Sequence, residues 1–441
     1  MSIQTENIEL SRMNSEISLS QEDTLPRNES SLAPVDRGFD AWSFLVAAFF
    51  IERLVWGFPN AFGVFLDGYL SDPSFSSQPH TSSLLPLIRP LSSRIIYCSS
   101  PIIYPITAKY PYHRRMFMWV GATLCWASLL GASYTTKVST LIGLQGVLYA
   151  VGGSLLYAPC ISYMSEWFVT RRGLANSVIF AGTATGGLIL PLILPELISR
   201  YGTAKTLRIL SVALAALLLP TLPFVKPLIP DSRSRQQVPP PRSREWIKSA
   251  SFWILLAANT FQGFGYFVPI VWLPTFAHAM NLSPTNPSLT VALLNGASVL
   301  GRLSMGYLSD KFNPWLLGMS TLFVTSLATF VLWGVLSQSL AGLLAFGIAY
   351  GILAGGWSSL WTGFVSPIAS VGNILCTPIS SVLETASGSA VGSASTGFQA
   401  ADGRFENMIL YVGSCFAGAA SVALLGWGLN MNVIRSRRQR V

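Results

Sequence analysis

Charged side chains stand inside several long apolar runs of this sequence, where a charge is costly and therefore points to a role. Arg302, in the run from Val299 to Gly306, is the clearest case. Its guanidinium stays charged and offers a fork of N–H donors that suits a carboxylate. We therefore predict that Arg302 binds an anionic group. The alternative is an arginine that extends along its helix toward the aqueous end, where Asp310 follows.

Glu52 is the remaining acid that lies deep in an apolar run. A carboxyl group in that setting is a candidate for relaying protons. Its neighbour Arg53 supplies the alternative, in which the arginine neutralises the acid or extends toward an interface. Glu52 is therefore the candidate residue for coupling to protons.

Uncharged polar residues give weaker signals. Asn259, Gln262 and Tyr266 fall at positions i, i+3 and i+7, so they form one polar stripe along a helix. Such a stripe can face a bound molecule, but bonding to another helix is the more common use. Trp56 could stack on a flat substrate, although aromatic belts at membrane interfaces use the same residue. We keep all four as candidate substrate-binding residues.

The sequence carries no pattern typical of an enzyme. It contains no catalytic triad motif, no P-loop and no dinucleotide-binding loop. Its three histidines are isolated, and its five cysteines are scattered singly through apolar stretches without the spacing of a zinc site. We therefore predict a protein that is not an enzyme and that has no metal and no cofactor.

The elements that must hold these side chains are set by composition. Hydrophobic residues make up 51% of the chain and charged residues only 11%, against roughly a quarter charged in soluble domains. Long apolar runs recur along almost the whole length, and each is long enough to cross a bilayer as a helix. The runs lack the alternation of barrel strands. The sequence thus predicts an all-α membrane protein embedded in a lipid bilayer.

Window hydropathy divides the chain into two sets of six spans joined by a basic, proline-containing linker. The predicted spans cover residues 41–69, 82–107, 116–134, 138–164, 174–198 and 207–225, then 251–277, 287–308, 315–336, 340–365, 366–383 and 407–429. The predicted organisation is a disordered tail at 1–38, a six-helix bundle at 39–225, a linker at 226–249, a second bundle at 250–430 and a basic tail at 431–441.

Lys and Arg residues indicate the orientation, because they collect in short cytoplasmic loops. They are concentrated in alternate loops, in the linker and in the C-terminal tail. This pattern places both termini in the cytoplasm of a multi-pass protein, with the plasma membrane as the default location. The net charge of +9 arises from these short clusters and not from one basic face, so we expect no nucleic-acid partner.

Two segments carry a resemblance to a known family. Residues 306–312 (GYLSDKF) have the form of the loop after the second helix of each half in the major facilitator superfamily. Residues 167–186 (WFVTRRGLANSVIFAGTATG) closely resemble the fifth-helix signature of its monocarboxylate-porter branch. Residues 36–42 (DRGFDAW) resemble that branch's first-helix signature, and residues 57–65 (GFPNAFGVF) are similar to its fungal members.

The resemblance implies a fold of 12 transmembrane helices in two six-helix halves, and it implies roles for several residues. Arg302 matches an arginine of the eighth helix that is linked to substrate in the family. Arg171, Arg172, Asp310 and Lys311 fall in the loops that gate the cytoplasmic side. Many relatives place an acid one turn before the arginine, but this chain has Ser298 there, so proton coupling is left open.

Glycines recur every four residues in two predicted helices. Gly182 and Gly186 form such a face, and Gly347, Gly351 and Gly355 form another. Small residues at this spacing let helices approach closely. The faces are either static packing or interfaces that move.

The predicted function is the movement of a small organic acid or an acidic metabolite across a membrane by alternating access, with secondary-metabolite efflux as the favoured direction. The first alternative is a transporter of an uncharged or vitamin-like solute. The second is a non-transporting receptor or inactive paralogue, because the predicted eleventh span is unusually short.

Overall fold

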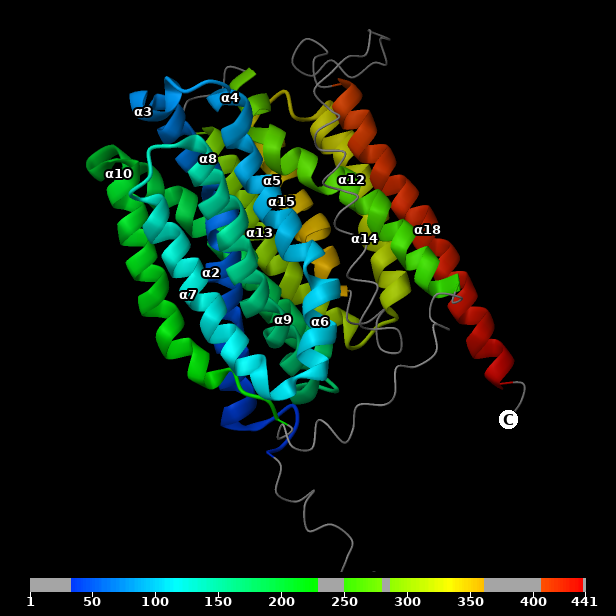
Figure 1. Ribbon diagram of the computed structural model, residues 1–441. Coiled ribbons are helices and arrows are strands. Elements are labelled where there is room, and N and C mark those ends of the chain that lie inside the picture. Colours follow the sequence, from blue (N-terminus) through cyan, green and yellow to red (C-terminus); the bar gives the residue numbers. More distant parts are fainter. Residues whose placement is uncertain (1–32, 229–249, 280–285, 361–405, 439–441) are drawn as a thin grey trace, which may run out of the picture.

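The computed structural model describes residues 33–228, 250–279, 286–360 and 406–438. The described chain is helical throughout and contains no strand. Most of the long helices run side by side as one bundle, with α10 at one edge and α18 at the opposite edge (Figure 1). The predicted all-α class is confirmed.

The first part of the chain is built on four long helical stretches and several short elements. In chain order they are α2 (Gly38–Ser71), α3 (Pro73–Ser76), α4 (Thr81–Leu84), η1 (Leu85–Leu87), α5 (Ile88–Cys98), α6 (Ser100–Lys109), η2 (Pro111–His113), α7 (Arg114–Ala132), α8 (Val138–Leu141), the π-helical η3 (Ile142–Leu148), α9 (Tyr149–Trp167), α10 (Arg172–Thr221) and η4 (Leu222–Phe224).

The second part continues with α12 (Ala250–Ala279), α13 (Asn286–Ser309), α14 (Pro314–Ala328), the π-helical η6 (Thr329–Val335), α15 (Leu340–Gly356), η7 (Trp357–Leu360) and α18 (Glu406–Arg438). Local chemistry fixes two of these starts. The Asn313 side chain accepts from the Trp315 N–H, and the Ser339 side chain accepts from the Gly342 N–H. Each thereby satisfies a backbone donor that the first helical turn leaves without a partner.

The predicted span 174–198 lies within α10, and the predicted span 207–225 begins in α10 and extends through η4. The helix direction changes at Gly202, whose φ of 76° and ψ of 166° are not helical. Glycine adopts a positive φ without the steric penalty that other residues suffer. Gly202 therefore divides α10 into the two predicted segments.

Six helical stretches in the described chain are long and apolar enough to cross a membrane: Gly38–Ser71, Val138–Trp167, Arg172–Phe224, Pro314–Val335, Leu340–Leu360 and Met408–Met431. The third of these holds two of the predicted spans. The predicted span at 366–383 lies outside the described residues, as do most of the predicted linker and most of the predicted N-terminal tail.

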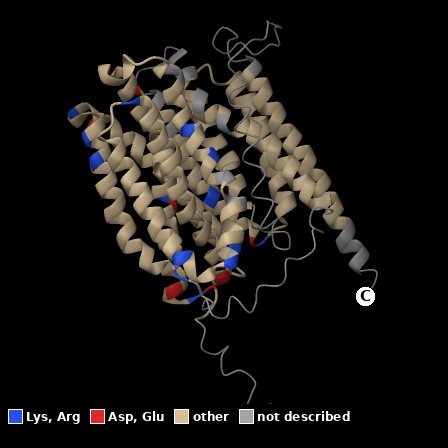
Figure 2. Cartoon of the chain, viewed as in Figure 1, with Lys and Arg blue, Asp and Glu red and all other residues tan. Residues whose placement is uncertain are grey.

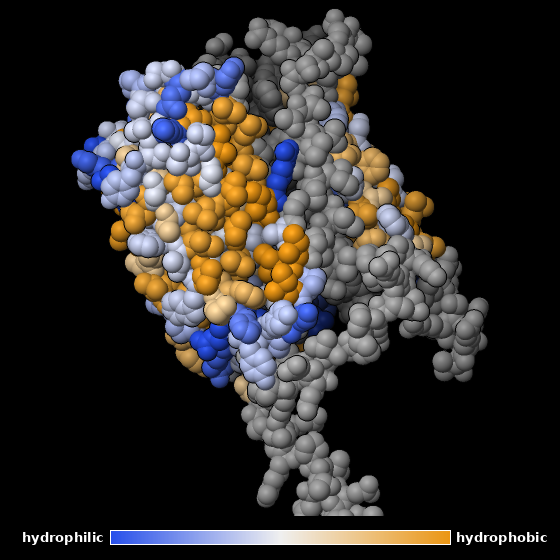
Figure 3. Space-filling model, in the orientation of Figure 1, coloured by the Kyte–Doolittle hydropathy of each residue, from blue (hydrophilic) through white to orange (hydrophobic). Residues whose placement is uncertain are grey.

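The surface is divided into charged ends and an apolar flank, as a protein in a bilayer requires. Lys, Arg, Asp and Glu gather toward the two ends of the bundle, and few lie between them (Figure 2). Apolar side chains cover much of the visible flank between these ends (Figure 3). Exposed large apolar residues such as Leu192, Val212, Phe323 and Leu425 contribute to this outer surface. The chain is thus a multi-pass membrane protein.

The buried apolar residues form two clusters. One draws only on residues between Ala41 and Val225, and the other only on residues between Leu255 and Ala423. The boundary between them falls at the predicted linker.

The glycine faces pack within each cluster's own set of helices. A side chain at Gly186 would meet the Arg53 carbonyl oxygen at 2.7 Å and the Gly57 Cα at 2.9 Å, so this face of α10 lies against α2. Gly351 and Gly355 of α15 lie equally close to Leu294 and Ser298 of α13. The geometry therefore favours the static-packing interpretation of both faces.

Candidate functional site

Arg302 lies on α13 and reaches across to α10. It is 7% exposed, and its Nη1 donates to the Phe180 carbonyl oxygen. Its Nε is buried without a hydrogen-bond partner. The side chain does not extend to Asp310, whose carboxylate accepts from two backbone N–H groups of α10 instead. A buried guanidinium with an unused donor is suited to receiving an anion.

Glu52 lies on α2 and is 2% exposed. Its Oε1 accepts a hydrogen bond of 2.8 Å from the Thr183 hydroxyl of α10. The charge of Arg302 acts on this carboxyl group. Within the described chain, Glu52 forms no ion pair with Arg302 or with Arg53. The structure thus brings the two predicted charged residues to the same turn of α10.

Two asparagines extend this arrangement and were missed from the sequence. Asn60 of α2 donates to the Thr183 carbonyl oxygen at 3.4 Å, and Asn295 of α13 donates to the Gly187 carbonyl oxygen at 3.3 Å. Asn60 lies about two turns from Glu52, and Asn295 lies about two turns from Arg302, so each pair shares a helix face. Polar groups from α2 and α13 therefore converge on residues 180–187 of α10, which we call the central seam.

One side chain of the polar stripe on α12 forms a hydrogen bond between helices. The Asn259 Oδ1 accepts from the indole N–H of Trp357 at 2.7 Å. The Tyr350 hydroxyl donates to the Tyr266 carbonyl oxygen at 3.0 Å. Gln262 is buried on the same helix, and Trp56 is buried within the first apolar cluster. This geometry favours the interhelical alternative for Asn259.

Two aspartates bind the N-terminus of α10 at the end of the bundle that carries Arg114, Arg171, Arg172, Lys226 and Lys311, here called the basic end. Asp36 precedes α2, and its carboxylate accepts from the N–H groups of Val169, Thr170 and Arg171 at 3.0–3.1 Å. Asp310 follows α13 and accepts from the N–H groups of Gly173 and Leu174 at 2.7 and 2.9 Å. Negative charge at this position is favoured by the helix dipole. The contact made by Asp310 joins the two parts of the chain.

The Asp36 carboxyl illustrates the electrostatics of this end. Burial opposes its ionisation, but the hydrogen bonds from Thr170, Arg171 and Val169 outweigh burial, and the pKa lies below its ordinary value. A lowered pKa contributes stability that is present above the ordinary pKa of aspartate and is lost as the pH falls through the lowered value. This contact is therefore formed at neutral pH.

The other predicted gating residues lie beside these aspartates. The Arg172 Nε donates to the Phe168 carbonyl oxygen at 3.0 Å. The Lys311 ammonium lies 4.2 Å from the centre of the Tyr307 ring. Arg171 contributes its backbone N–H to Asp36. All four predicted gating residues thus lie where α13 meets α10.

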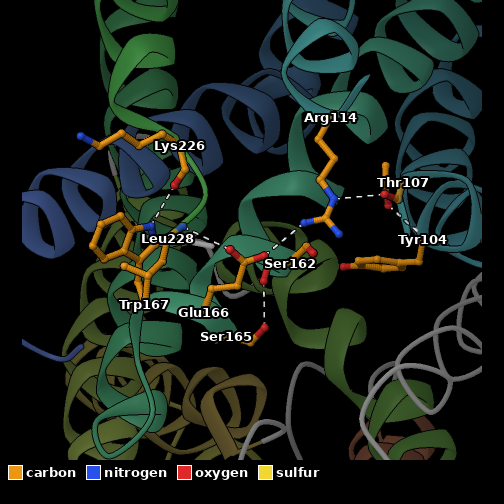
Figure 4. Close-up of polar contacts among 9 residues, drawn as sticks. All are labelled: Tyr104, Thr107, Arg114, Ser162, Ser165, Glu166, Trp167, Lys226 and Leu228. Atoms are coloured by element: carbon orange, nitrogen blue, oxygen red, sulfur yellow. Dashed lines mark hydrogen bonds and ion pairs between the residues drawn. The ribbon is translucent and has the colours of Figure 1, made fainter. Parts of the chain in front are cut away.

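A buried ion pair braces the basic end within the first part of the chain (Figure 4). The Arg114 Nη1 lies 3.1 Å from the Glu166 Oε1, and the Arg114 Nε donates to the Thr107 carbonyl oxygen. The Glu166 Oε2 accepts from the Leu228 N–H, while the Trp167 indole donates to the Lys226 carbonyl oxygen. This clasp fixes the point at which the chain leaves η4.

We expect Arg114→Met to lower the melting temperature of the purified protein clearly. The side chains of Arg114 and Glu166 are only 9% and 15% exposed, and leaving one buried charge unpaired costs about 3 kcal/mol. Arg200→Met is the matched control, because the Arg200–Glu196 pair is 67% and 63% exposed and such pairs contribute about 0–1 kcal/mol. Equal melting temperatures for the two variants would contradict a stabilising clasp.

Comparison with known proteins identifies relatives over most of the chain. The family model of the Major Facilitator Superfamily matches residues 45–401. The Fujikurins efflux protein of Gibberella fujikuroi is 27% identical over 81% of this chain and 76% of its own length. Monocarboxylate transporter 10 of Rattus norvegicus is 26% identical over 78% of this chain and 68% of its own length.

A solved structure supports the same fold. The proton:xylose symporter XylE, bound to 6-bromo-6-deoxy-D-glucose, superposes with a TM-score of 0.60 and covers 88% of this chain and 94% of its own. Its sequence is only 14% identical, so this likeness concerns the fold alone. The predicted family, including its fungal and monocarboxylate-porter character, is confirmed by these relatives.

Proposed function

The chain belongs to the major facilitator superfamily and is a membrane transporter, not an enzyme, and from this premise we propose that its substrate is a small organic acid or an acidic metabolite. The observation that carries the proposal is Arg302, a buried guanidinium on α13 with an Nε that has no hydrogen-bond partner. A permanent positive charge in that setting requires a counter-charge. A substrate carboxylate supplies it.

The proposed architecture has twelve spans in two six-helix halves, at 39–225 and 250–430, and transport occurs by alternating access. The two separate apolar clusters support this division. The substrate binds between the halves, near the central seam, where α2 and α10 of the first half meet α13 of the second. The basic end faces the cytoplasm together with both termini, and the membrane is the plasma membrane.

The proposed direction is efflux of a secondary metabolite. The relative named as a fujikurin efflux protein supports this direction, and the relative named as a monocarboxylate transporter supports an acidic substrate. An uncharged substrate is the competing proposal, and Ser298 favours it, because the acid that accompanies the arginine in many relatives is absent.

The decisive experiment measures accumulation of labelled aliphatic and aromatic monocarboxylates and of acidic fungal metabolites in cells that express the protein. Accumulation is compared with that in cells lacking the protein, with and without an imposed pH gradient. A protein-dependent change limited to anionic compounds is the expected result. Competition by neutral solutes of unrelated structure would favour the uncharged class instead.

Glu52 is the proposed coupling residue, since it is buried and within electrostatic reach of Arg302. We expect Glu52→Gln to abolish accumulation driven by a pH gradient, bringing the ratio of internal to external substrate to about 1, because an amide cannot bind and release a proton. Exchange of labelled for unlabelled substrate should persist. Gradient-driven accumulation at the wild-type level in Glu52→Gln would exclude this role, and Glu196→Gln, an exposed acid, serves as the control.

A further inference from the structure

The acid and the base of the central seam are close but are held apart. Glu52 and Arg302 are both buried, and the charge of one acts on the other. Two buried opposite charges are most stable when they form a direct, hydrogen-bonded pair. The structure shows no such pair between these two residues. The Glu52 carboxylate and the Arg302 guanidinium therefore form hydrogen bonds with other groups.

These contacts come from one turn of α10. The Thr183 hydroxyl donates to the Glu52 carboxylate at 2.8 Å, and the Phe180 carbonyl oxygen accepts from Arg302. Residues three apart lie on neighbouring positions of a helix surface. One turn of α10 thus binds both the acid of α2 and the base of α13.

Close packing fixes Thr183 in this position. A side chain at Gly182 would meet the Arg53 backbone nitrogen at 3.0 Å and the Glu52 Cβ at 3.2 Å. The absence of a side chain at Gly182 therefore lets α10 lie directly against α2. The packing of the α10 backbone against α2 therefore places the Thr183 hydroxyl beside the Glu52 carboxylate.

We propose that Thr183 is a positioning residue that retains Glu52 on the first half and thereby leaves Arg302 available to the substrate anion. This inference rests on the proposed function of Arg302. Without the hydroxyl, the Glu52 carboxylate turns to the Arg302 guanidinium, whose charge already acts on it. The substrate anion then competes with an intramolecular carboxylate for the same donors.

The test is a kinetic comparison of Thr183→Val with wild type, using the labelled monocarboxylate that the wild type carries best. We expect KM to rise on the order of tenfold, the effect of about 1.4 kcal/mol of competition, with little change in the maximal rate. Thr183→Ser keeps the donor and should restore the wild-type KM. Thr221→Val is the matched control, because Thr221 lies on α10 outside the central seam and its hydroxyl donates to the Leu218 carbonyl oxygen of its own helix.

The double variant Thr183→Val/Glu52→Gln separates positioning from direct substrate contact. Glutamine cannot form an ion pair with Arg302, so the KM of the double variant should equal that of Glu52→Gln alone. An additional rise in KM in that background, or an unchanged KM in Thr183→Val, would overturn the inference. Thr183→Ala replaces the valine variant in both comparisons if the latter does not reach the membrane.

The outcomes also separate this inference from the proposed function. If Arg302→Ala abolishes transport and Thr183→Val behaves as wild type, Arg302 binds the anion and only the positioning role fails. If the wild type carries none of the anions, or if Arg302→Ala carries them normally, the anion proposal fails and the role of Thr183 fails with it.

Discussion

Arg302→Ala is expected to reduce the transport of organic anions by about 30-fold or more. Removing one partner of a buried, hydrogen-bonded charge pair costs about 2–5 kcal/mol, and each 1.4 kcal/mol corresponds to a factor of ten. Arg302→Lys keeps the charge but loses the planar fork of donors, so an intermediate loss is expected. Initial rates measured over a range of substrate concentrations, corrected for protein at the membrane, provide the comparison.

Arg302 also donates across the seam to the Phe180 carbonyl oxygen, so a structural role must be distinguished from anion binding. Arg302→Gln retains an N–H donor for that carbonyl without the charge. If anion binding is the role, the glutamine variant is as inactive as the alanine variant. Arg200→Ala removes an exposed arginine and should leave the rate unchanged. Substantial anion transport by Arg302→Gln would show that the charge is not required.

Hydropathy alone located the helices well where a span is uniformly apolar. The predicted span 315–336 corresponds to α14 and η6 at Pro314–Val335, and the prediction 116–134 corresponds to α7 at Arg114–Ala132. The predicted span 82–107 appears instead as separate elements, with α5 ending at Cys98 and α6 beginning at Ser100. Hydropathy reports the tendency to leave water and not the local backbone geometry. Hydropathy therefore does not predict breaks between helices within an apolar run.

The candidate site was predictable only in its charged members. Arg302 and Glu52 stand out because an ionisable group inside an apolar run is costly. Thr183 gives no comparable signal, since a helical threonine commonly bonds its own backbone, as Thr185 does. Only the packing of α10 against α2 shows that Thr183 bonds Glu52. The stripe on α12 shows the reverse, because its spacing is suggestive but Asn259 bonds Trp357.

Gly306→Val is expected to lower the rate of transport about fivefold or more by opening the contact between α13 and α10 at the basic end. A side chain at Gly306 would meet the Ser177 side chain and the Gly173 carbonyl oxygen, and the two helices have no space for it. Overpacking of this kind costs about 1–3 kcal/mol, which shifts a two-state equilibrium by roughly fivefold or more. The Asp310 contacts with the N-terminus of α10 would separate at the same time.

Cysteine accessibility distinguishes this opening from a general loss of structure. Ser177→Cys, placed in a background without the native cysteines, should resist a membrane-impermeant maleimide applied to the face of the membrane at the basic end, because Ser177 is fully buried beside Gly306. Combined with Gly306→Val, it should be labelled, since separation of α13 from α10 exposes it to water. Gly63→Val is the control, because a side chain there meets no atom within 4 Å. If Gly306→Val slowed transport while position 177 stayed unlabelled, the variant would not separate α13 from α10. The contact between these helices at the basic end would then not be the contact that opens during transport.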